Sequence, residues 1–316
     1  MADETSRRPP RLRAGSRVAV IAPSSGVLEG SELDRGVAAL AGLGLDVVLG
    51  PAVRDIRGYL AGEDRRRAED LLWALGDDRI DAVWCARGGY GAQRTVAALD
   101  PAELRTLAGR PAKPLIGFSD ITVLHALVSA CLGWPSFYGP TVTDLPGATD
   151  YTLAALRAAL FTAEPYVVER PGDDPWVSTL HGGRAEGELA GGCLTLLAAL
   201  AGTPLQVSFA GRIGFFEDVH EPIYAIDRYL CQLLAAGCFR GCRGIVIGEL
   251  ADSRAERPNT LGLEQVFADL LAPLGVPCCF YLPIGHGTHL ATLPIGAHAR
   301  LDADAGTLSI LEPAVR

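Results

Sequence analysis

Between residues 17 and 132, short apolar runs alternate with amphipathic segments. The apolar runs, which are the strand candidates, lie at residues 17–22, 46–49, 81–86 and 113–117. The helix candidates lie at residues 31–43, 63–75 and 121–132, and the first of these carries Leu33, Val37 and Leu40 at helical spacing. Strands that alternate with helices of this length indicate βαβ units. The pattern therefore predicts an α/β domain over residues 17–163, with a mostly parallel sheet flanked by helices.

The pattern changes after a helix candidate at residues 151–161. Residues 164–180 are polar and contain prolines, which is typical of a linker. Beyond them short strands dominate, at residues 186–190, 212–216, 244–247, 277–282, 299–302 and 308–311, with helix candidates at 193–200, 223–236 and 261–274. We therefore expect a smaller C-terminal α+β domain over residues 181–316, a disordered N-terminal tail over residues 1–16, and a cleft between the two domains.

Charge and composition narrow the classes of partner. The 316 residues include 28 basic and 37 acidic ones, so the formal net charge is −9. This balance lacks the basic footprint of a general nucleic-acid binder and gives no attraction to anionic lipid. The basic residues near the N-terminus precede no apolar segment, and no apolar run reaches the roughly 18 residues that span a bilayer. We expect a cytoplasmic protein without nucleic-acid or membrane partners.

The cysteine and histidine spacings favour neither a disulfide framework nor a metal site. Eight cysteines in 316 residues are too few for a disulfide scaffold. Cys238 and Cys242 are spaced like two metal ligands, but no second such pair and no suitably spaced histidine accompany them. His286 and His289 could share a metal, yet no nearby carboxylate completes that set. We expect reduced thiols, no metal and no cofactor.

Ser119 lies where a strand candidate runs into the apolar helix candidate 121–132, within the sequence Gly-Phe-Ser-Asp. A serine on a sharp strand-to-helix turn is typical of a nucleophile elbow, although the second glycine of the G-x-S-x-G pattern is missing. Such a turn also aims the first N–H groups of the helix at the group that the serine attacks. The alternative is that Ser119 only caps the helix.

Three further segments also follow strand candidates. Residues 87–91 (RGGYG) could donate a backbone N–H to an oxyanion, or could form a plain tight turn. Glu217 could orient a base, or could be an exposed strand end or the partner of Arg228. His286, flanked by glycines, could be that base. A serine, a histidine and a glutamate at three strand ends are the components of a catalytic triad. No G-x-G-x-x-G follows a strand candidate, which disfavours a dinucleotide site.

Taken together, these segments resemble the serine LD-carboxypeptidase family, peptidase family S66, which also contains microcin-immunity peptidases. The matching segments are residues 18–25 (VAVIAPSS), 86–91 (ARGGYG), 115–120 (LIGFSD), 137–140 (FYGP), 216–219 (FEDV), 224–228 (YAIDR), 283–286 (PIGH) and 293–296 (LPIG). They occur in order over nearly the whole chain. The resemblance implies an N-terminal α/β domain, a smaller C-terminal domain, an active site at their junction and a homodimer.

The resemblance also implies a role for each site residue. Ser119 corresponds to the nucleophile, His286 to the base and Glu217 to the acid that orients the base. The backbone N–H groups of Gly89 and Asp120 correspond to the oxyanion hole. Members of the family need no metal and cleave an L–D peptide bond, releasing terminal D-alanine from murein tetrapeptides during cell-wall recycling. The expected partner is therefore a small muropeptide.

Two features leave the substrate open. The family usually has asparagine where this chain has Cys193, which affects local hydrogen bonding or substrate contact. A microcin-immunity peptidase, which cleaves an amide beside an acyl-nucleotide, is the alternative. That branch tends to carry a longer insert between nucleophile and acid and needs an aromatic platform for the base. Of the two tryptophans between Ser119 and Glu217, Trp134 is expected in the core and Trp176 could line the cleft. An acyl-transferring synthase and a non-catalytic binding module on the same fold are remoter alternatives.

Overall fold

The computed structural model describes residues 8–172, 177–254 and 260–316. The chain divides into two compact units. Unit 1 contains Met1–Ala163, to which Thr292–Pro294 and Ala314–Arg316 return, and unit 2 contains Glu164–Ala291 and Ile295–Pro313. Among the described residues, no helix is long and apolar enough to cross a membrane.

A six-stranded sheet forms the centre of unit 1 within the described part of the chain. Its strands are β1 (Arg17–Ile21), β2 (Asp46–Leu49), β3 (Ala82–Cys85), β4 (Leu115–Gly117), β5 (Ser136–Tyr138) and β12 (Leu293–Ile295). The order across the sheet is β12-β5-β4-β3-β1-β2, and the pairs from β5 to β2 are all parallel. The predicted α/β class with a parallel sheet is therefore confirmed.

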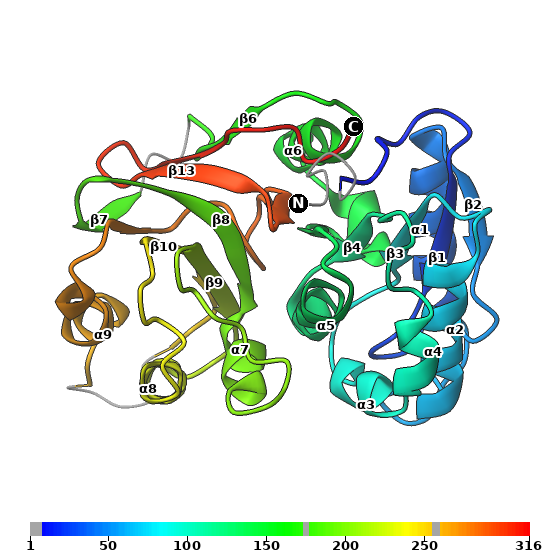
Figure 1. Cartoon of the computed structure of the whole chain (residues 1–316), viewed down its shortest axis with the longest axis horizontal. Coiled ribbons are helices and arrows are strands. Elements are labelled where there is room, and N and C mark those ends of the chain that lie inside the picture. The colour runs from blue at the N-terminus through cyan, green and yellow to red at the C-terminus, as the bar shows by residue number, and fades with distance from the viewer. Residues whose placement is uncertain (1–7, 173–176, 255–259) are drawn as a thin grey trace. The chain divides into compact units, whose positions relative to one another are not determined.

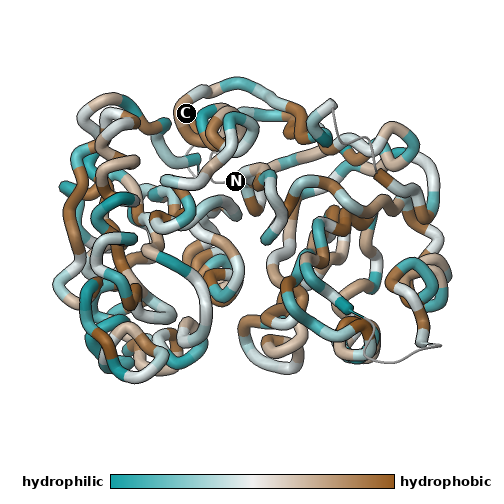
Figure 2. Tube along the Cα trace, turned by 180° about the vertical axis from the view of Figure 1, so that it is seen from behind, coloured by the Kyte–Doolittle hydropathy of each residue, from teal (hydrophilic) through white to brown (hydrophobic). Residues whose placement is uncertain are grey.

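The helices of unit 1 lie around this sheet (Figure 1), and the first, second and fifth of them contact its strands. They are α1 (Gly30–Gly42), α2 (Asp64–Gly76), α3 (Ala92–Ala97), α4 (Pro101–Arg105), α5 (Thr122–Leu132) and α6 (Asp150–Leu160), with the 3₁₀ turns η2 (Ser119–Ile121) and η3 (Val142–Gly147). In α1 the buried positions Leu33, Gly36 and Leu40 recur every three or four residues. Figure 2 shows hydrophobic and hydrophilic residues in turn along the helices, as expected of elements packed by one side.

Unit 2 is built on a mixed sheet. Its strands are β6 (Tyr166–Val168), β7 (Ser178–His181), β8 (Arg184–Cys193), β9 (Ile213–Val219), β10 (Gly244–Ala251), β11 (Cys278–Phe280), β13 (His298–Asp302) and β14 (Thr307–Ile310). In the order β6-β14-β13-β8-β9-β10-β11-β7, the pairs from β8 to β11 are parallel and the outer pairs are antiparallel. Its helices are α7 (Leu194–Leu200), α8 (Ile223–Ala235) and α9 (Leu263–Leu270), with the turn η4 (Ala272–Leu274). Their buried side chains share one apolar core with β9, β10 and β11.

Two terminal or connecting segments are more ordered than the sequence pattern predicts. Within the described part of the expected tail, the Arg11 N–H donates to the Arg316 carbonyl and the Leu12 side chain is buried. The segment 164–180, expected as a linker, contributes β6 and the first residues of β7 to the sheet of unit 2. Both segments are polar in composition, so the local sequence gives no sign of this order. The first pairs with the C-terminus, and the second pairs with strands that are distant in the sequence.

The loops that carry the candidate residues of unit 1 lie at one edge of its sheet. Strands β1, β3 and β4 are neighbours and parallel, so their carboxyl ends share an edge. The loops after these strands begin at residues 22, 86 and 118. In parallel α/β sheets this edge is where ligands bind.

His125 on α5 gives a pH dependence of stability. Its Nε2 donates to the Gly117 carbonyl at 2.9 Å, so its Nδ1 accepts from the Ser136 hydroxyl at 2.8 Å. Burial lowers the pKa of His125 to about 4. The unfolded chain therefore binds a proton between about pH 6.5 and 4 that the folded chain does not, and stability falls as the pH falls through this range.

We expect this histidine to account for about 3 kcal/mol of stability lost between pH 7 and pH 4. His125→Gln keeps a donor for the Gly117 carbonyl but does not titrate. Urea unfolding at pH 7.5, 6.0 and 5.0 should give a smaller loss of unfolding free energy in the variant than in the wild type. Equal losses in the two proteins would contradict the assignment.

Candidate active site

Ser119 has the backbone geometry of a nucleophile elbow. Strand β4 ends at Gly117, and Ser119 begins the turn η2 with φ 62°, a left-handed conformation that a serine rarely adopts. Such strain costs roughly 1–3 kcal/mol and persists only where the surroundings enforce it. Ser119 is not the cap of α5, because Ile121 holds that position. The elbow interpretation is therefore favoured over the capping one.

The surroundings of Ser119 hold its backbone and leave its side chain partly exposed. Its N–H donates to the Tyr138 hydroxyl at 3.1 Å, and its carbonyl accepts from the Thr122 hydroxyl at 2.7 Å. The Tyr138 side chain is buried and meets the Phe118 ring edge-to-face. Because Tyr138 takes up the Ser119 N–H, the oxyanion donors at this turn must come from other residues.

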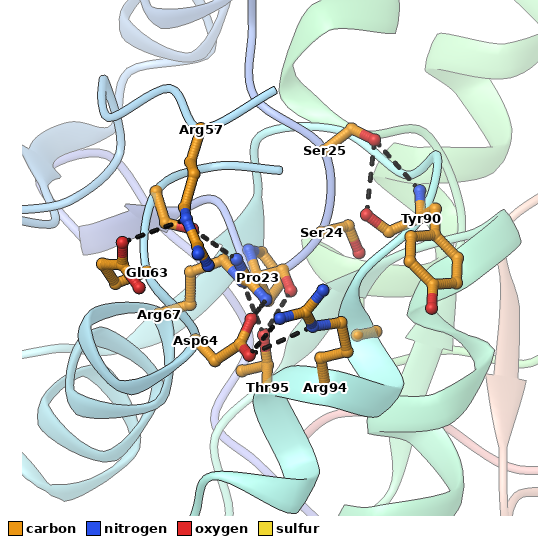
Figure 3. Close-up of polar contacts among 12 residues, drawn as sticks. Pro23, Ser24, Ser25, Arg57, Glu63, Asp64, Arg67, Tyr90, Arg94 and Thr95 are labelled. Carbon is orange, nitrogen blue, oxygen red and sulfur yellow. Dashed lines mark hydrogen bonds and ion pairs between the residues drawn. The ribbon is translucent and has the colours of Figure 1, made fainter. Parts of the chain in front are cut away.

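The loop 87–91 lies directly against Ser119. A Cβ added at Gly88 would be 3.0 Å from Cβ and 3.3 Å from Oγ of Ser119, so any side chain here would require Ser119 to shift by a few tenths of an ångström. Gly89 has φ 102°, and a Cβ there would be 2.4 Å from the Ser25 hydroxyl oxygen. The loop is also bonded to the segment after β1, since the Ser25 N–H donates to the Gly88 carbonyl and the Tyr90 N–H donates to the Ser25 hydroxyl at 3.0 Å (Figure 3).

The Asp120 side chain points away from solvent and is almost completely buried. Its Oδ2 accepts from the Ser24 hydroxyl at 2.6 Å and from the Ala92 N–H at 2.8 Å. Burial raises the pKa of this carboxyl, whereas the hydrogen bonds and the nearby Arg67 guanidinium act in the opposite direction. The sequence pattern assigned only the backbone N–H of Asp120 to the site, so this carboxylate is a feature that it missed.

An ion-pair network around the buried Arg67 supports the same loops from α2 and α3 (Figure 3). The Arg67 side chain is fully buried and donates to the Thr95 hydroxyl, the Gly62 carbonyl and Asp64. Arg94 also donates to Asp64, with both of its bonds to Oδ2. The Thr95 hydroxyl in turn donates to the Pro23 carbonyl at 2.7 Å. The segment that precedes Ser24 is therefore fixed to two helices.

In unit 2, Glu217 and His286 form a hydrogen-bonded pair. The Glu217 side chain on β9 is completely buried, and its Oε2 lies 2.7 Å from Nδ1 of His286, whose side chain is 19% exposed. A carboxylate only accepts, so Nδ1 carries the hydrogen and Nε2 is the basic nitrogen. Gly285 has φ 103°, and a Cβ there would be 2.1 Å from Glu217 Oε2. The two alternatives for Glu217, an exposed strand end and a pair with Arg228, are excluded by its burial and by the placement of Arg228 over the Tyr224 ring.

Cys193 and Asp218 lie beside this pair. Cys193 is the register partner of Glu217 between β8 and β9, and its thiol lies 3.5 Å from Asp218 Oδ1. Burial raises the pKa of this thiol well above its ordinary range. Asp218 accepts from both the N–H and the hydroxyl of Thr195 at the start of α7. The residue that replaces the family's asparagine is thus a neutral thiol that packs next to the acid of the predicted triad.

Each unit therefore holds some of the predicted catalytic and oxyanion-hole residues. Unit 1 brings together Ser119, the loop with Gly89 and the Asp120 side chain, and unit 2 brings together Glu217 and His286. Among the described residues there is no group of three or more potential metal ligands, and none of the cysteines forms a disulfide. Trp134 is buried as predicted, and Trp176 lies outside the described residues.

Comparison with known proteins gives matches in both halves of the chain. The sequence pattern of the LD-carboxypeptidase N-terminal domain (peptidase family S66) matches residues 18–139, and that of the corresponding C-terminal domain matches residues 186–301. A putative carboxypeptidase of Streptomyces coelicolor is 43% identical over 98% of this chain and 97% of its own length.

Two further proteins add to the comparison, one through the substrate in its name and one through its solved structure. A murein tetrapeptide carboxypeptidase of Pseudomonas aeruginosa is 37% identical over 91% of this chain and 94% of its own length. The crystal structure of an MccF-like protein from Bacillus anthracis superposes with a TM-score of 0.86 at 24% identity, covering 96% of this chain and 99% of that one. At that identity the superposition establishes the common fold.

Proposed function

The chain belongs to the LD-carboxypeptidase family, peptidase family S66, and we propose that it releases terminal D-alanine from murein tetrapeptides through Ser119, His286 and Glu217. The proposal rests mainly on the buried Glu217–His286 pair, which fixes the imidazole tautomer that a general base requires. The similarity to a murein tetrapeptide carboxypeptidase over most of both chains supports the substrate.

In the acylation step, the Ser119 oxygen attacks the carbonyl carbon of the scissile L–D amide while Nε2 of His286 takes the hydroxyl proton. The negative charge that develops on the carbonyl oxygen is stabilised by the N–H groups of Gly89 and Asp120. Glu217 stabilises the imidazolium that forms. The tetrahedral intermediate then expels D-alanine, whose amine receives the proton from His286.

In the deacylation step, water replaces the amine. The water oxygen attacks the ester carbonyl carbon while His286 takes a proton from the water. His286 then returns that proton to the Ser119 oxygen as the ester bond breaks. The products are D-alanine and a peptide with a new terminal carboxylate. We assign this reaction, as for the family, to a cytoplasmic homodimer in cell-wall recycling.

A side-by-side assay tests the substrate. We expect the purified protein to release D-alanine from L-Ala-γ-D-Glu-meso-diaminopimelate-D-Ala with a higher kcat/KM than it shows on an aminoacyl sulfamoyl adenylate. In H₂¹⁸O the new peptide carboxylate should gain one heavy oxygen, as hydrolysis requires. A preference of more than tenfold for the adenylate would favour the microcin-immunity reaction instead.

The same assay separates the remaining alternatives. Transfer of the acyl group to an added amine in preference to water would indicate a synthase. Binding of the tetrapeptide with no turnover of either compound would indicate a binding module. Mass detection of the products distinguishes the first three results, and a binding measurement with the tetrapeptide detects the fourth.

A further inference from the structure

Three chain segments that are far apart in sequence meet at the carboxylate of Asp120. The carboxylate follows Ser119 on the elbow, and it binds the Ser24 hydroxyl from the loop after β1 and the N–H of Ala92, the first residue of α3, directly after the loop that follows β3. Ser24 lies 96 positions from Asp120 in the sequence. These bonds join the elbow to both of the loops that surround it.

The loop after β3 needs such support because of its composition. Residues 88–91 include three glycines, and Gly89 and Gly91 both have positive φ. Glycine loses more conformational freedom on ordering than other residues, so this loop is held by its contacts rather than by its own preferences. Ser25 binds the loop at Gly88 and Tyr90, whereas Asp120 binds Ala92, the residue that directly follows the loop.

A small displacement of this loop has a large chemical consequence. Hydrogen-bond donors to an oxyanion act only when they are already placed within about 3 Å of the oxygen, and loss of one donor typically costs 10²–10³-fold in kcat. A Cβ added at Gly88 would lie 3.0 Å from Cβ of Ser119, and Gly89 follows Gly88 in the chain. The bonds to Asp120 and Ser25 are therefore positioned to control the distance between the loop N–H groups and the nucleophile.

We propose that the Asp120 carboxylate is a positioning residue that, through Ser24 and the Ala92 N–H, holds the loop 88–91 in register with Ser119. This proposal rests on the proposed function, because it takes Ser119 as the nucleophile and Gly89 as an oxyanion donor. Asp120 thereby has two roles, with its backbone N–H facing the oxyanion and its side chain fixing the other donor. The Arg67 network fixes Pro23 and so stabilises the position of Ser24.

Substitutions that spare the backbone N–H of residue 120 test the side chain alone. Asp120→Ala should lower kcat by about 10²–10³-fold with little change in KM, because the lost support acts on the transition state. Asp120→Asn, which keeps one acceptor oxygen, should lose less. Ser24→Ala should lower kcat in the wild type but have a much smaller effect in Asp120→Ala, since both changes remove the same connection.

Asp70 provides the matched control. It is also a buried carboxylate of unit 1 that accepts a backbone N–H, from Ala52 at 2.9 Å, and burial raises the pKa of its carboxyl too. Asp70→Ala should therefore lower the melting temperature as Asp120→Ala does, but leave kcat within about threefold of the wild type.

The outcomes distinguish this proposal from the proposed function. If Asp120→Ala and Ser24→Ala keep wild-type kcat while Ser119→Ala is inactive, the positioning role is wrong and the function stands. If Asp70→Ala loses kcat in proportion to Asp120→Ala, the effect is one of general stability and the positioning role is again wrong. If Ser119→Ala keeps its activity, the proposed function itself is wrong. Should Asp120→Ala fail to fold, Asp120→Asn and Ser24→Ala carry the same comparison.

Discussion

Ser119→Ala should abolish release of D-alanine, with kcat lowered by an amount on the order of 10⁶-fold, as for other serine nucleophiles. The variant keeps the elbow, so tetrapeptide binding should change little. Ser129 on the exposed side of α5 provides a matched control, because Ser129→Ala removes an exposed hydroxyl from the helix that follows the elbow. Turnover above a few per cent of wild type in a clean Ser119→Ala preparation would indicate another nucleophile.

The strained backbone gives this prediction a second readout. Ser119 has φ 62°, which glycine adopts without strain and which alanine, like serine, adopts only at a cost in free energy. Ser119→Gly should therefore be as inactive as Ser119→Ala yet more stable by about 1 kcal/mol. Urea unfolding of the two variants measures the difference. Equal stability would show that the elbow conformation is not enforced in the folded protein.

The alternation of strands and helices was predictable because each element is encoded locally. Strand β2 has the predicted bounds, and α1, α2 and α5 lie within one residue of theirs. The very short strands β5 and β12 were not predicted, since three residues carry too little periodicity to be recognised. The return of residues 292–294 to unit 1 was also missed, because a local pattern does not specify which sheet a strand joins.

The candidate site was predictable only in part for a similar reason. Ser119, Glu217 and His286 each follow a strand candidate in the sequence and carry a reactive group, and these are features of a single segment. The interactions of Asp120 with Ser24 and of Ser119 with Tyr138 depend on which loops meet in space. A buried carboxylate next to a nucleophile looks the same in sequence as an exposed one, and only the fold identifies its partners.

Glu217→Gln is the second change with a very large expected effect. In the wild type, the buried carboxylate accepts from Nδ1 of His286. In the proposed mechanism it also stabilises the imidazolium. A glutamine that turns its NH₂ toward Nδ1 forces the hydrogen onto Nε2, which then cannot take the Ser119 proton. A glutamine that turns its oxygen toward Nδ1 keeps the tautomer but loses the negative charge. We therefore expect kcat to fall by about 10⁴-fold.

Asp218→Asn is the matched control for this change. Asp218 is the next residue on β9 and is also a buried carboxylate, but it binds Thr195 at the start of α7. Its substitution should lower the melting temperature while kcat stays within about tenfold of the wild type. If the two variants lost activity equally, the effect would come from disruption of β9, and Glu217 would have no special part in orienting His286. A loss confined to Glu217→Gln, with KM unchanged, is the result that a Ser-His-Glu mechanism requires.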